Sequence, residues 1–384
     1  MSEDRSKDPS GIQTLNGAQF WPRLSQKGAE ARVPVQAMIE LTYGCNLRCV
    51  HCYNPTHTAK EELAANQIQR ILDQLAEQGC LSLAFTGGEI FTRKDAFEIF
   101  DYAKAKGFAV TLLTNATLIS PERADRIQAL GPHQVEISIY GATQETYERV
   151  TRIPCSFHAF LTGVQLLRER TIPLLIKMPV MTLNQHEVLQ AKALVEGWGI
   201  KFVYCTEIFP RVDGSLEPLQ YRLAPHDVVR IDDSMLGSQR WRAEGDEEKG
   251  ESCQAGEGLF TCLCGKSSLA VTPYGRMNLC VSLPTPQYDL RSGTVSEGWR
   301  TLVEFVDSTN GKPGDAYECP QCPVQGHCRQ GPMDAWLERR RLEPCLAYFK
   351  ELATLEKQVS EAVNRTDQGG REKNTAADRD GVRS

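Results

Sequence analysis

The sequence predicts an α/β protein: an open, curved sheet of six parallel strands with helices between them, followed by a cysteine-rich region. Three observations lead to this prediction. Short apolar runs alternate with amphipathic stretches from residue 35 to about residue 204, as in successive strand–helix units. Six strands are too few for a closed eight-stranded barrel. Eight of the 14 cysteines lie between residues 253 and 345, where this alternation has stopped.

The composition is that of an ordinary globular protein. The chain has 384 residues, of which 41% are hydrophobic and 24% charged, which suggests two or three domains of roughly 100–200 residues each. A formal net charge of −6 argues against a general electrostatic grip on nucleic acid. No apolar stretch approaches the ~20 residues of a membrane helix, and the polar start lacks a signal peptide. We therefore expect a cytoplasmic protein with neither a nucleic-acid nor a membrane partner.

The six strands are expected at the apolar runs of the first half of the chain. Because a helix separates each pair, the strands should be parallel, and a ligand should bind beyond their carboxyl ends. The runs comprise residues 35–41, 81–85, 109–113, 134–139, 174–181 and 201–205.

Helices are expected between the runs. Ile68, Ile71, Leu72 and Leu75 follow helical spacing after a possible Asn66 cap. Ser120 and Pro121 occupy the preferred cap and first-turn positions of another helix, which Gly131 closes. Apolar residues at helical spacing mark two more helices, over 157–167 and 188–198.

These patterns divide the chain into five parts. A polar, irregular N-terminal segment precedes the sheet, and a bridging region follows it. The last part is a C-terminal helix with a tail, residues 364–384, whose composition predicts disorder. The predicted parts are residues 1–34, 35–205, 206–261, 262–350 and 351–384.

Three cysteines directly follow the first strand. Cys45, Cys49 and Cys52 have the spacing C-x3-C-x2-C, so three thiolates on one loop are available for three irons of a cubane cluster, and the fourth iron is open to a substrate or cofactor. The alternatives are a zinc site or three unrelated thiols. His51 is too tightly placed to chelate beside both neighbours, and paired C-x2-C spacing is missing, so the cluster is the favoured interpretation.

Here the chain resembles the radical S-adenosylmethionine (SAM) superfamily, over about residues 35–205. The resemblance implies a partial (β/α)6 barrel. It also implies SAM contacts at three further sites. His51 would pack near the adenine, and a Gly-Gly-Glu segment would bind the methionine amino group. Polar residues at strand ends, with one arginine from a helix, would lie near the ribose and the carboxylate of SAM. The residues concerned are Gly87, Gly88, Glu89, Asn115, Ser138 and either Arg149 or Arg152.

The second group of cysteines resembles a SPASM domain, which holds up to two auxiliary [4Fe–4S] clusters in that family. By this resemblance one cluster has a complete ligand set in Cys319, Cys322, Cys328 and Cys345. The other lacks a ligand, because Pro332 stands where the family has a cysteine. The thiols left for it are Cys253, Cys262, Cys264 and Cys280.

Three outcomes remain open for this second auxiliary site: a substitute thiolate from Cys253 or Cys262, an open iron, or no cluster. We favour occupancy, with Cys264 and Cys280 as ligands. A structural zinc ribbon is the alternative for the whole region. Outside the two groups, Cys80 and Cys205 are expected in the core, and Cys155 is expected to serve packing.

By resemblance, the expected activity is reductive cleavage of SAM to a 5′-deoxyadenosyl radical, which abstracts hydrogen from a substrate. The favoured substrate is a ribosomally made peptide that is cross-linked or otherwise modified. Because residues 1–34 are short for a peptide-recognition module, we expect a separate leader-binding protein. A flavodoxin- or ferredoxin-type protein is the expected electron donor. No hydrogen donor or catalytic base is evident in the sequence.

Other functions compete with peptide maturation. Radical SAM oxidation or decarboxylation of a small molecule or tetrapyrrole is the main alternative, and sulfatase-type protein maturation is a third. A non-enzymatic iron–sulfur carrier would need neither the open iron nor the glycine-rich second site.

Overall fold

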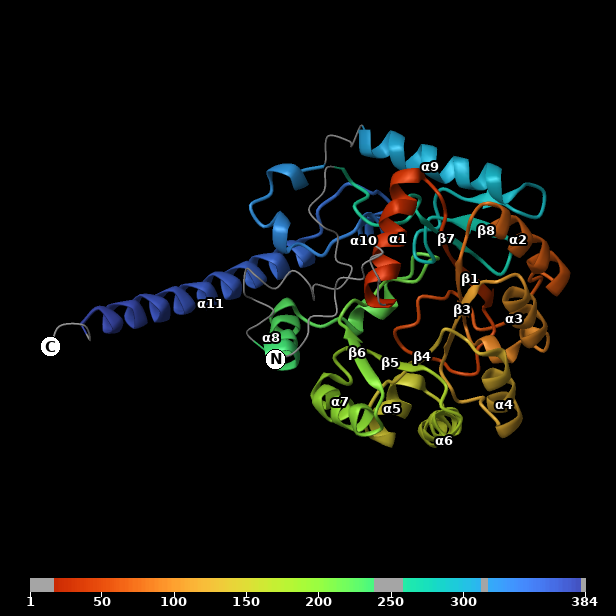
Figure 1. Cartoon of the computed structure of the whole chain (residues 1–384), viewed down its shortest axis with the longest axis horizontal. Helices are drawn as coiled ribbons and strands as arrows, with labels where there is room; N and C mark the ends of the chain where they lie inside the picture. Colours follow the sequence, from red (N-terminus) through yellow and green to blue (C-terminus); the bar gives the residue numbers. More distant parts are fainter. Residues whose placement is uncertain (1–16, 238–257, 312–316, 381–384) are drawn as a thin grey trace, which may run out of the picture.

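The computed structural model describes residues 17–237, 258–311 and 317–380 (Figure 1). The six predicted strands are all present, and each pairs in parallel with the next along the chain. The predicted fold class is therefore confirmed. The strands are β1 (Gln36–Thr42), β2 (Ser82–Gly87), β3 (Ala109–Thr114), β4 (Gln134–Ser138), β5 (Leu174–Pro179) and β6 (Lys201–Cys205).

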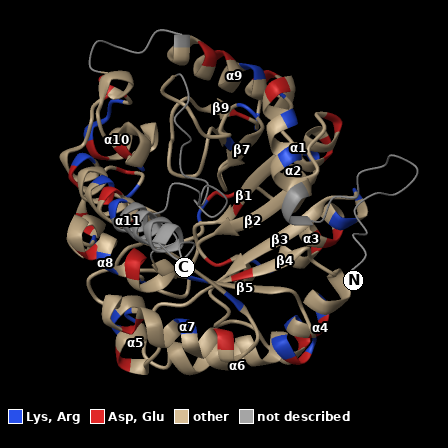
Figure 2. Cartoon of the chain, turned by 60° about the vertical axis from the view of Figure 1, so that its left-hand side comes forward, with Lys and Arg blue, Asp and Glu red and all other residues tan. Residues whose placement is uncertain are grey.

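Helices lie along the outside of the curved sheet (Figure 2). Alternate residues of the strands, such as Leu83, Phe85 and Val110, are buried beneath them, as the period of two in a strand requires. The helical elements of this half are α2 (Ala65–Glu77), η1 (Ile90–Thr92), α3 (Ala96–Ala105), α4 (Pro121–Leu130), α5 (Gln144–Thr151), α6 (Ser156–Glu169), η2 (Gln185–Glu187) and α7 (Val188–Gly197).

The predicted helix signals are confirmed at α4 and corrected at α2. The Ser120 hydroxyl accepts a hydrogen bond from the Arg123 backbone N–H at 3.3 Å, and Gly131 ends α4 in the left-handed conformation. Asn66 is not a cap, because it lies inside α2. The helix is preceded by Ala64, whose N–H donates to the Gln67 side chain at 2.9 Å, so the cap bond comes from the third helical residue.

The cysteine-rich region extends the same sheet. β7 (Ser268–Val271) pairs in parallel with β1, and β8 (Arg276–Asn278) and β9 (Tyr288–Asp289) continue antiparallel. Helix α9 (Val295–Gly311) is tied to the core, since its first N–H donates to the Gln74 side chain at 2.8 Å. The sheet is therefore continuous across the boundary predicted at residue 262.

The rest of the C-terminal half gathers beyond the β6 edge (Figure 1). Contacts between α8 and α11 and between α11 and η6 hold it together. Its elements are η3 (Glu217–Tyr221), α8 (Pro225–Leu236), η5 (Cys319–Gln321), η6 (Gln325–His327), α10 (Pro332–Arg339) and α11 (Ala347–Asp380).

Both ends of the chain differ from expectation. The segment predicted as irregular contains α1 (Gly17–Ala31), because Ser25 and Gly28 lie on one buried face and a Cβ at Gly28 would meet Val35 at 2.9 Å. Helix α11 continues to Asp380, through residues predicted as disordered.

The isolated cysteines divide between core and surface. Cys80 is buried as predicted, at 3% exposure. Cys205 is exposed, so its core placement was wrong: it ends β6, which is an edge strand of the sheet formed by the described residues. Cys155 is exposed just before α6. Within the described part of the chain, no helix combines the length and apolar character needed to cross a bilayer.

Candidate SAM and iron–sulfur site

The cysteine loop after β1 is held by backbone hydrogen bonds on both sides. Its Arg48 and Val50 N–H groups donate to Thr151 and Val150 at the end of α5, at 2.9 and 3.0 Å. Within the loop, the Cys52 N–H donates to the Cys49 carbonyl at 3.1 Å. Since the neighbouring Leu47 and Val50 side chains are only 1% and 4% exposed, the core fixes the loop beneath the thiols.

The three thiols of the loop lie close enough to influence one another. Burial raises the pKa of Cys45 to about 11, with smaller contributions from Glu89 and Cys52. Burial also raises the pKa of Cys49, followed by the effects of Cys52 and Cys45. Neutral thiols are therefore favoured at pH 7 unless a metal offsets the charge of the thiolates.

The arrangement of the Cys45, Cys49 and Cys52 thiols is compatible with an iron–sulfur cluster. In the described part of the chain, no three Cys, His, Asp or Glu side chains converge as one metal ion would require. The thiolates of a cubane each bind a different iron, so they need not meet at one point.

His51 presents a neutral ring with a free nitrogen inside the same loop. Its ring centre lies 5.3 Å from that of Tyr140, and its buried Nδ1 has no hydrogen-bond partner among the described residues. Burial lowers the pKa of His51 to about 4, so the ring is uncharged at pH 7. An uncharged aromatic ring with an unused polar atom is suited to contact a nucleobase, as the resemblance implies.

Glu89 is committed to internal hydrogen bonds. Its side chain is fully buried and accepts from the Thr114 hydroxyl at 2.8 Å and from the Asn115 N–H at 2.7 Å. It also accepts from the Phe91 N–H at 3.2 Å. Burial raises the pKa of Glu89, and these donors counter the rise. The carboxylate therefore joins the ends of β2 and β3, a positioning role that sequence reasoning did not foresee.

Gly87 and Gly88 are required by close backbone packing. A Cβ at Gly87 would lie 2.2 Å from the Thr42 carbonyl oxygen, and one at Gly88 would lie 2.3 Å from that of Gly44. Only glycine permits such an approach. The predicted second site thus packs directly on the start of the cysteine loop.

The remaining predicted SAM contacts divide into two groups. Asn115 joins the cysteine loop, because its Nδ2 donates to Asn46 Oδ1 at 3.0 Å. Ser138 ends β4 and hydrogen-bonds the Tyr140 side chain. Arg149 donates to the Leu183 carbonyl at 2.8 Å, and Arg152 donates to the Tyr221 hydroxyl at 3.3 Å. The two arginines thus contact segments that follow β5.

Sequence reasoning missed a buried carboxyl beneath the loop. Glu40 on β1 is 1% exposed and accepts hydrogen bonds from the hydroxyls of Tyr53 at 2.9 Å and Tyr43 at 3.3 Å. These tyrosines flank the three cysteines in sequence, so one carboxyl is bonded to both ends of the loop. Burial raises the pKa of Glu40 to about 7. A charged residue inside an otherwise apolar strand was the available signal.

Cys262, Cys264 and Cys280 form one neighbouring set of thiols beside β7 and β8. The hydrogen bond between the Cys262 and Cys264 thiols, together with burial, raises the pKa of Cys262. The hydrogen bond between Cys264 and Cys280 lowers the pKa of Cys280. Cys253, the fourth candidate, lies outside the described residues.

Cys319, Cys322, Cys328 and Cys345 form a separate set near α11. Burial, then the neighbouring Cys345 and Cys322, raises the pKa of Cys319, which places these thiols together. Pro332 is the first residue of α10, where a missing N–H costs nothing. Apart from Cys253, which lies outside the described residues, the predicted auxiliary ligands thus lie in two groups.

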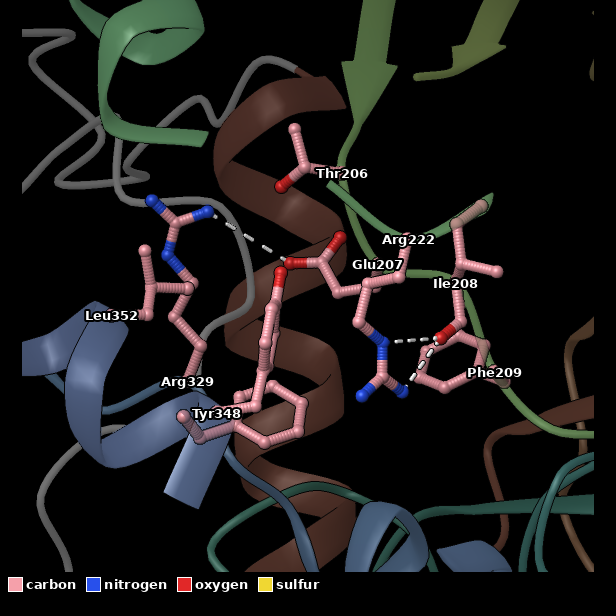
Figure 3. A pocket seen from close by; sticks show the side chains of 9 residues that line it. Thr206, Glu207, Ile208, Phe209, Arg222, Arg329, Tyr348 and Leu352 are labelled. Carbon is pink, nitrogen blue, oxygen red and sulfur yellow. Dashed lines mark hydrogen bonds and ion pairs between the residues drawn. The ribbon is translucent and has the colours of Figure 1, made fainter. Parts of the chain in front are cut away.

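Arg329 fastens this last set to the segment that follows β6, and Arg222 lies across the same small cavity (Figure 3). Arg329, which follows Cys328, pairs with Asp232 of α8 and Glu356 of α11, and lies 3.9 Å from Glu207 after β6. Arg222 donates to the Ile208 carbonyl at 2.8 Å. The cavity between them, about 10 Å³, has room for little more than a water molecule.

Residues 39–195 match the radical SAM superfamily. An AdoMet-dependent heme synthase from Methanosarcina barkeri is 35% identical over 196 residues, 50% of this chain and 55% of that protein. The mycofactocin maturase MftC of Mycobacterium tuberculosis is 28% identical over 331 residues, 82% of each chain.

A solved structure shows the same fold. The crystal structure of Streptococcus suis SuiB bound to precursor peptide SuiA aligns with a TM-score of 0.64 at 14% identity, covering 90% of this chain and 82% of that one. The chain spans about half the length of relatives such as the heme synthase. The part of the chain that carries the cysteine loop and the parallel sheet, residues 39–195, is thus the part that matches the radical SAM superfamily.

Proposed function

We propose that this protein is a radical SAM enzyme that modifies a ribosomally made peptide. The observation that carries the proposal is the gathering of three thiols on one loop, directly against the Gly87–Gly88 turn and His51. Cys45, Cys49 and Cys52 would hold a [4Fe–4S] cluster, which together with bound SAM would supply one-electron reductive cleavage of the sulfonium and, from it, hydrogen abstraction from the substrate.

The residues of the chain have distinct tasks in this proposal. Cys45, Cys49 and Cys52 hold the cluster. Glu89 and Asn115 brace the strand ends around it, through the hydrogen bonds that join them to each other and to the cysteine loop. His51 offers the neutral ring beside the nucleoside. The fully buried apolar floor, including Leu47 and Tyr147, excludes water from the reactive carbon.

Relatives and chain layout support a peptide substrate. The match to the mycofactocin maturase covers 82% of each chain. The match to the heme synthase covers 50% of this chain and 55% of that protein. We propose that both further sets of thiols bind auxiliary [4Fe–4S] clusters. A flavodoxin- or ferredoxin-type donor and a leader-binding protein complete the proposed system in the cytoplasm.

Tetrapyrrole chemistry is the second candidate, favoured by the 35% identity to the heme synthase. The two are distinguished by incubating the reduced enzyme and SAM with a peptide encoded beside the gene, or with an iron-coproporphyrin. A mass change in the peptide alone supports maturation. A change in the porphyrin alone contradicts it.

The activity itself is tested by replacing Cys45, Cys49 and Cys52 with alanine. We expect the variant to lose about four irons per chain and all formation of 5′-deoxyadenosine under reducing conditions. Cys155→Ala is the matched control, because that thiol is exposed and outside the three sets. Continued SAM cleavage by the triple variant would exclude a radical SAM mechanism.

A further inference from the structure

The segment that follows β6 folds back onto the end of the cysteine loop. Its Val212 N–H donates to the Tyr53 carbonyl at 3.0 Å, and Tyr53 directly follows Cys52, the third thiol of the loop. A turn fixes this contact, since the Arg211 N–H donates to the Ser215 carbonyl at 2.9 Å. The backbone therefore anchors Arg211 beside the loop, although the two segments are far apart in sequence.

The Arg211 guanidinium lies close to the thiols. Burial raises the pKa of Cys52, and the charge of Arg211 is among the influences that counter this rise. Burial, followed by the charges of Arg48 and Arg211, lowers the pKa of His57, whose carbonyl accepts from the Cys45 N–H at 3.2 Å. Arg211 is therefore close to Cys52 and to the residue that holds the other end of the loop.

One nitrogen of this guanidinium is unused. Nε of Arg211 is buried and has no hydrogen-bond partner among the described residues, whereas Nη2 pairs with Glu217 at 2.9 Å. The Glu217 side chain is 42% exposed, so water weakens this pair. Because a buried N–H without an acceptor is costly, the arrangement favours a further acceptor or negative charge beside Arg211.

The other charges around the loop do not replace Arg211. Arg48 is engaged with the loop backbone, because its Nη1 donates to two carbonyls of the loop, both at 2.7 Å. After burial, Glu40 adds to the raised pKa of Cys52 and so opposes Arg211. Burial also raises the pKa of Glu40 to about 7, which leaves it partly uncharged at neutral pH. Asp213 accepts from a backbone N–H of its own turn at 3.0 Å.

We propose that Arg211 stabilises the added electron on the iron–sulfur cluster held by Cys45, Cys49 and Cys52. The inference rests on the proposed function, which assigns a [4Fe–4S] cluster to that loop. Reduction adds one negative charge to the cluster, and a permanently charged guanidinium beside it stabilises the reduced form more than the oxidised form. The electron comes from the donor that the proposed function already requires, and no atom is transferred.

The test is a redox titration of the iron-loaded protein without SAM, followed by electron paramagnetic resonance. The signal of the loop cluster is the one that is missing when Cys45, Cys49 and Cys52 are all replaced by alanine. In Arg211→Gln, we expect the ratio of reduced to oxidised loop cluster at a fixed potential to fall about tenfold, which for one electron is about 59 mV. Arg211→Lys keeps the charge and should retain most of the ratio.

Two further variants serve as control and as second test. Arg230→Gln is the matched control, because Arg230 also pairs with a carboxylate, Asp227, at 2.8 Å, and its helix, α8, carries no predicted cluster ligand. It should leave the ratio unchanged. Glu217→Gln removes the acid that opposes Arg211, so the ratio should rise about twofold.

The outcomes separate this inference from the proposed function. An unchanged ratio in Arg211→Gln, or an equal fall in Arg230→Gln, overturns the role of Arg211. Weaker SAM binding by Arg211→Gln with an unchanged ratio assigns the guanidinium to SAM and also overturns it. If Arg211→Gln holds no loop iron, an unchanged ratio in Glu217→Gln overturns it instead. If the natural protein reduced by dithionite makes no 5′-deoxyadenosine from SAM, the proposed function fails, while the ratio is still measured.

Discussion

Glu40 shows how one side chain organises the cysteine loop. Its two oxygens accept from Tyr43 and Tyr53, on either side of the thiols, in a position that is 1% exposed. Burial raises the pKa of Glu40 from 4.5 to about 7, and the hydrogen bonds from Tyr53 and Tyr43 only partly offset this rise. The folded protein therefore binds this proton more tightly than the unfolded chain, so the contribution to stability is present at low pH and is lost as the pH rises between these values.

Glu40→Gln should remove this pH dependence. The amide keeps the shape of the side chain and one acceptor but has no charge. We compare the free energy of unfolding of the variant with that of the natural protein at the same pH. This difference should be larger at about pH 8 than at about pH 4, by on the order of 3 kcal/mol in favour of the variant. Urea denaturation at the two pH values measures it. The exposed Glu196→Gln is the control, and a constant difference between Glu40→Gln and the natural protein would refute the assignment.

Residues close in sequence were predictable, and those brought together by the fold were not. The spacing of Cys45, Cys49 and Cys52 is visible in one short segment. In contrast, Glu89 meets its partner Asn115 only after α3 and β3 have intervened. A resemblance assigned Glu89 to a ligand, whereas its burial and three donors show that it also braces the sheet.

Among the elements, α6 illustrates a steric constraint that propensity alone misjudges. A Cβ at Gly163 would lie 2.0 Å from the Ala116 carbonyl oxygen, so the glycine lets α6 pack on the loop that begins at Asn115. At Gly197 in α7, a Cβ would meet no other atom within 4 Å. Both glycines lie in helices, but only at Gly163 would an added Cβ collide with another part of the chain. Gly197 therefore serves as the control for a substitution at Gly163.

Gly163→Ala should destabilise the protein although alanine is the better helix former. Helix propensity favours alanine by about 1 kcal/mol, but overpacking against backbone costs about 1–3 kcal/mol and displaces Ala116. We expect a lower thermal midpoint and weaker SAM binding. Gly197→Ala should leave both nearly unchanged. Equal effects in the two variants would contradict packing as the reason for Gly163.

Elements with a clear period were predictable, and those stabilised by tertiary contacts were not. The strands from β1 to β6 appear as apolar runs between helices. The short strands β7, β8 and β9 lie among cysteines, glycines and prolines, and β7 is defined by its pairing with β1. α1 was missed because its buried face consists of small residues such as Ser25 and Gly28.

For the molecule as a whole, the continuous sheet places the two further thiol sets on opposite sides. Cys264 and Cys280 lie beside β7 and β8, in the part of the sheet that continues from β1 to the edge strand β9. Cys328 is fastened through Arg329 to α8 and α11, beyond β6. Because neither set shares a thiol with the other, each should bind metal independently.

This independence predicts the iron content. Protein with Cys45, Cys49 and Cys52 replaced by alanine, reconstituted without oxygen, should retain about eight irons and matching sulfide. Replacing Cys264 and Cys280 as well should remove about four of them, and replacing Cys322 and Cys328 instead should remove the other four. About four irons in the first variant would leave one auxiliary cluster, with Pro332 explaining the loss. Zinc in place of iron would make these thiols structural and remove any electron-accepting role.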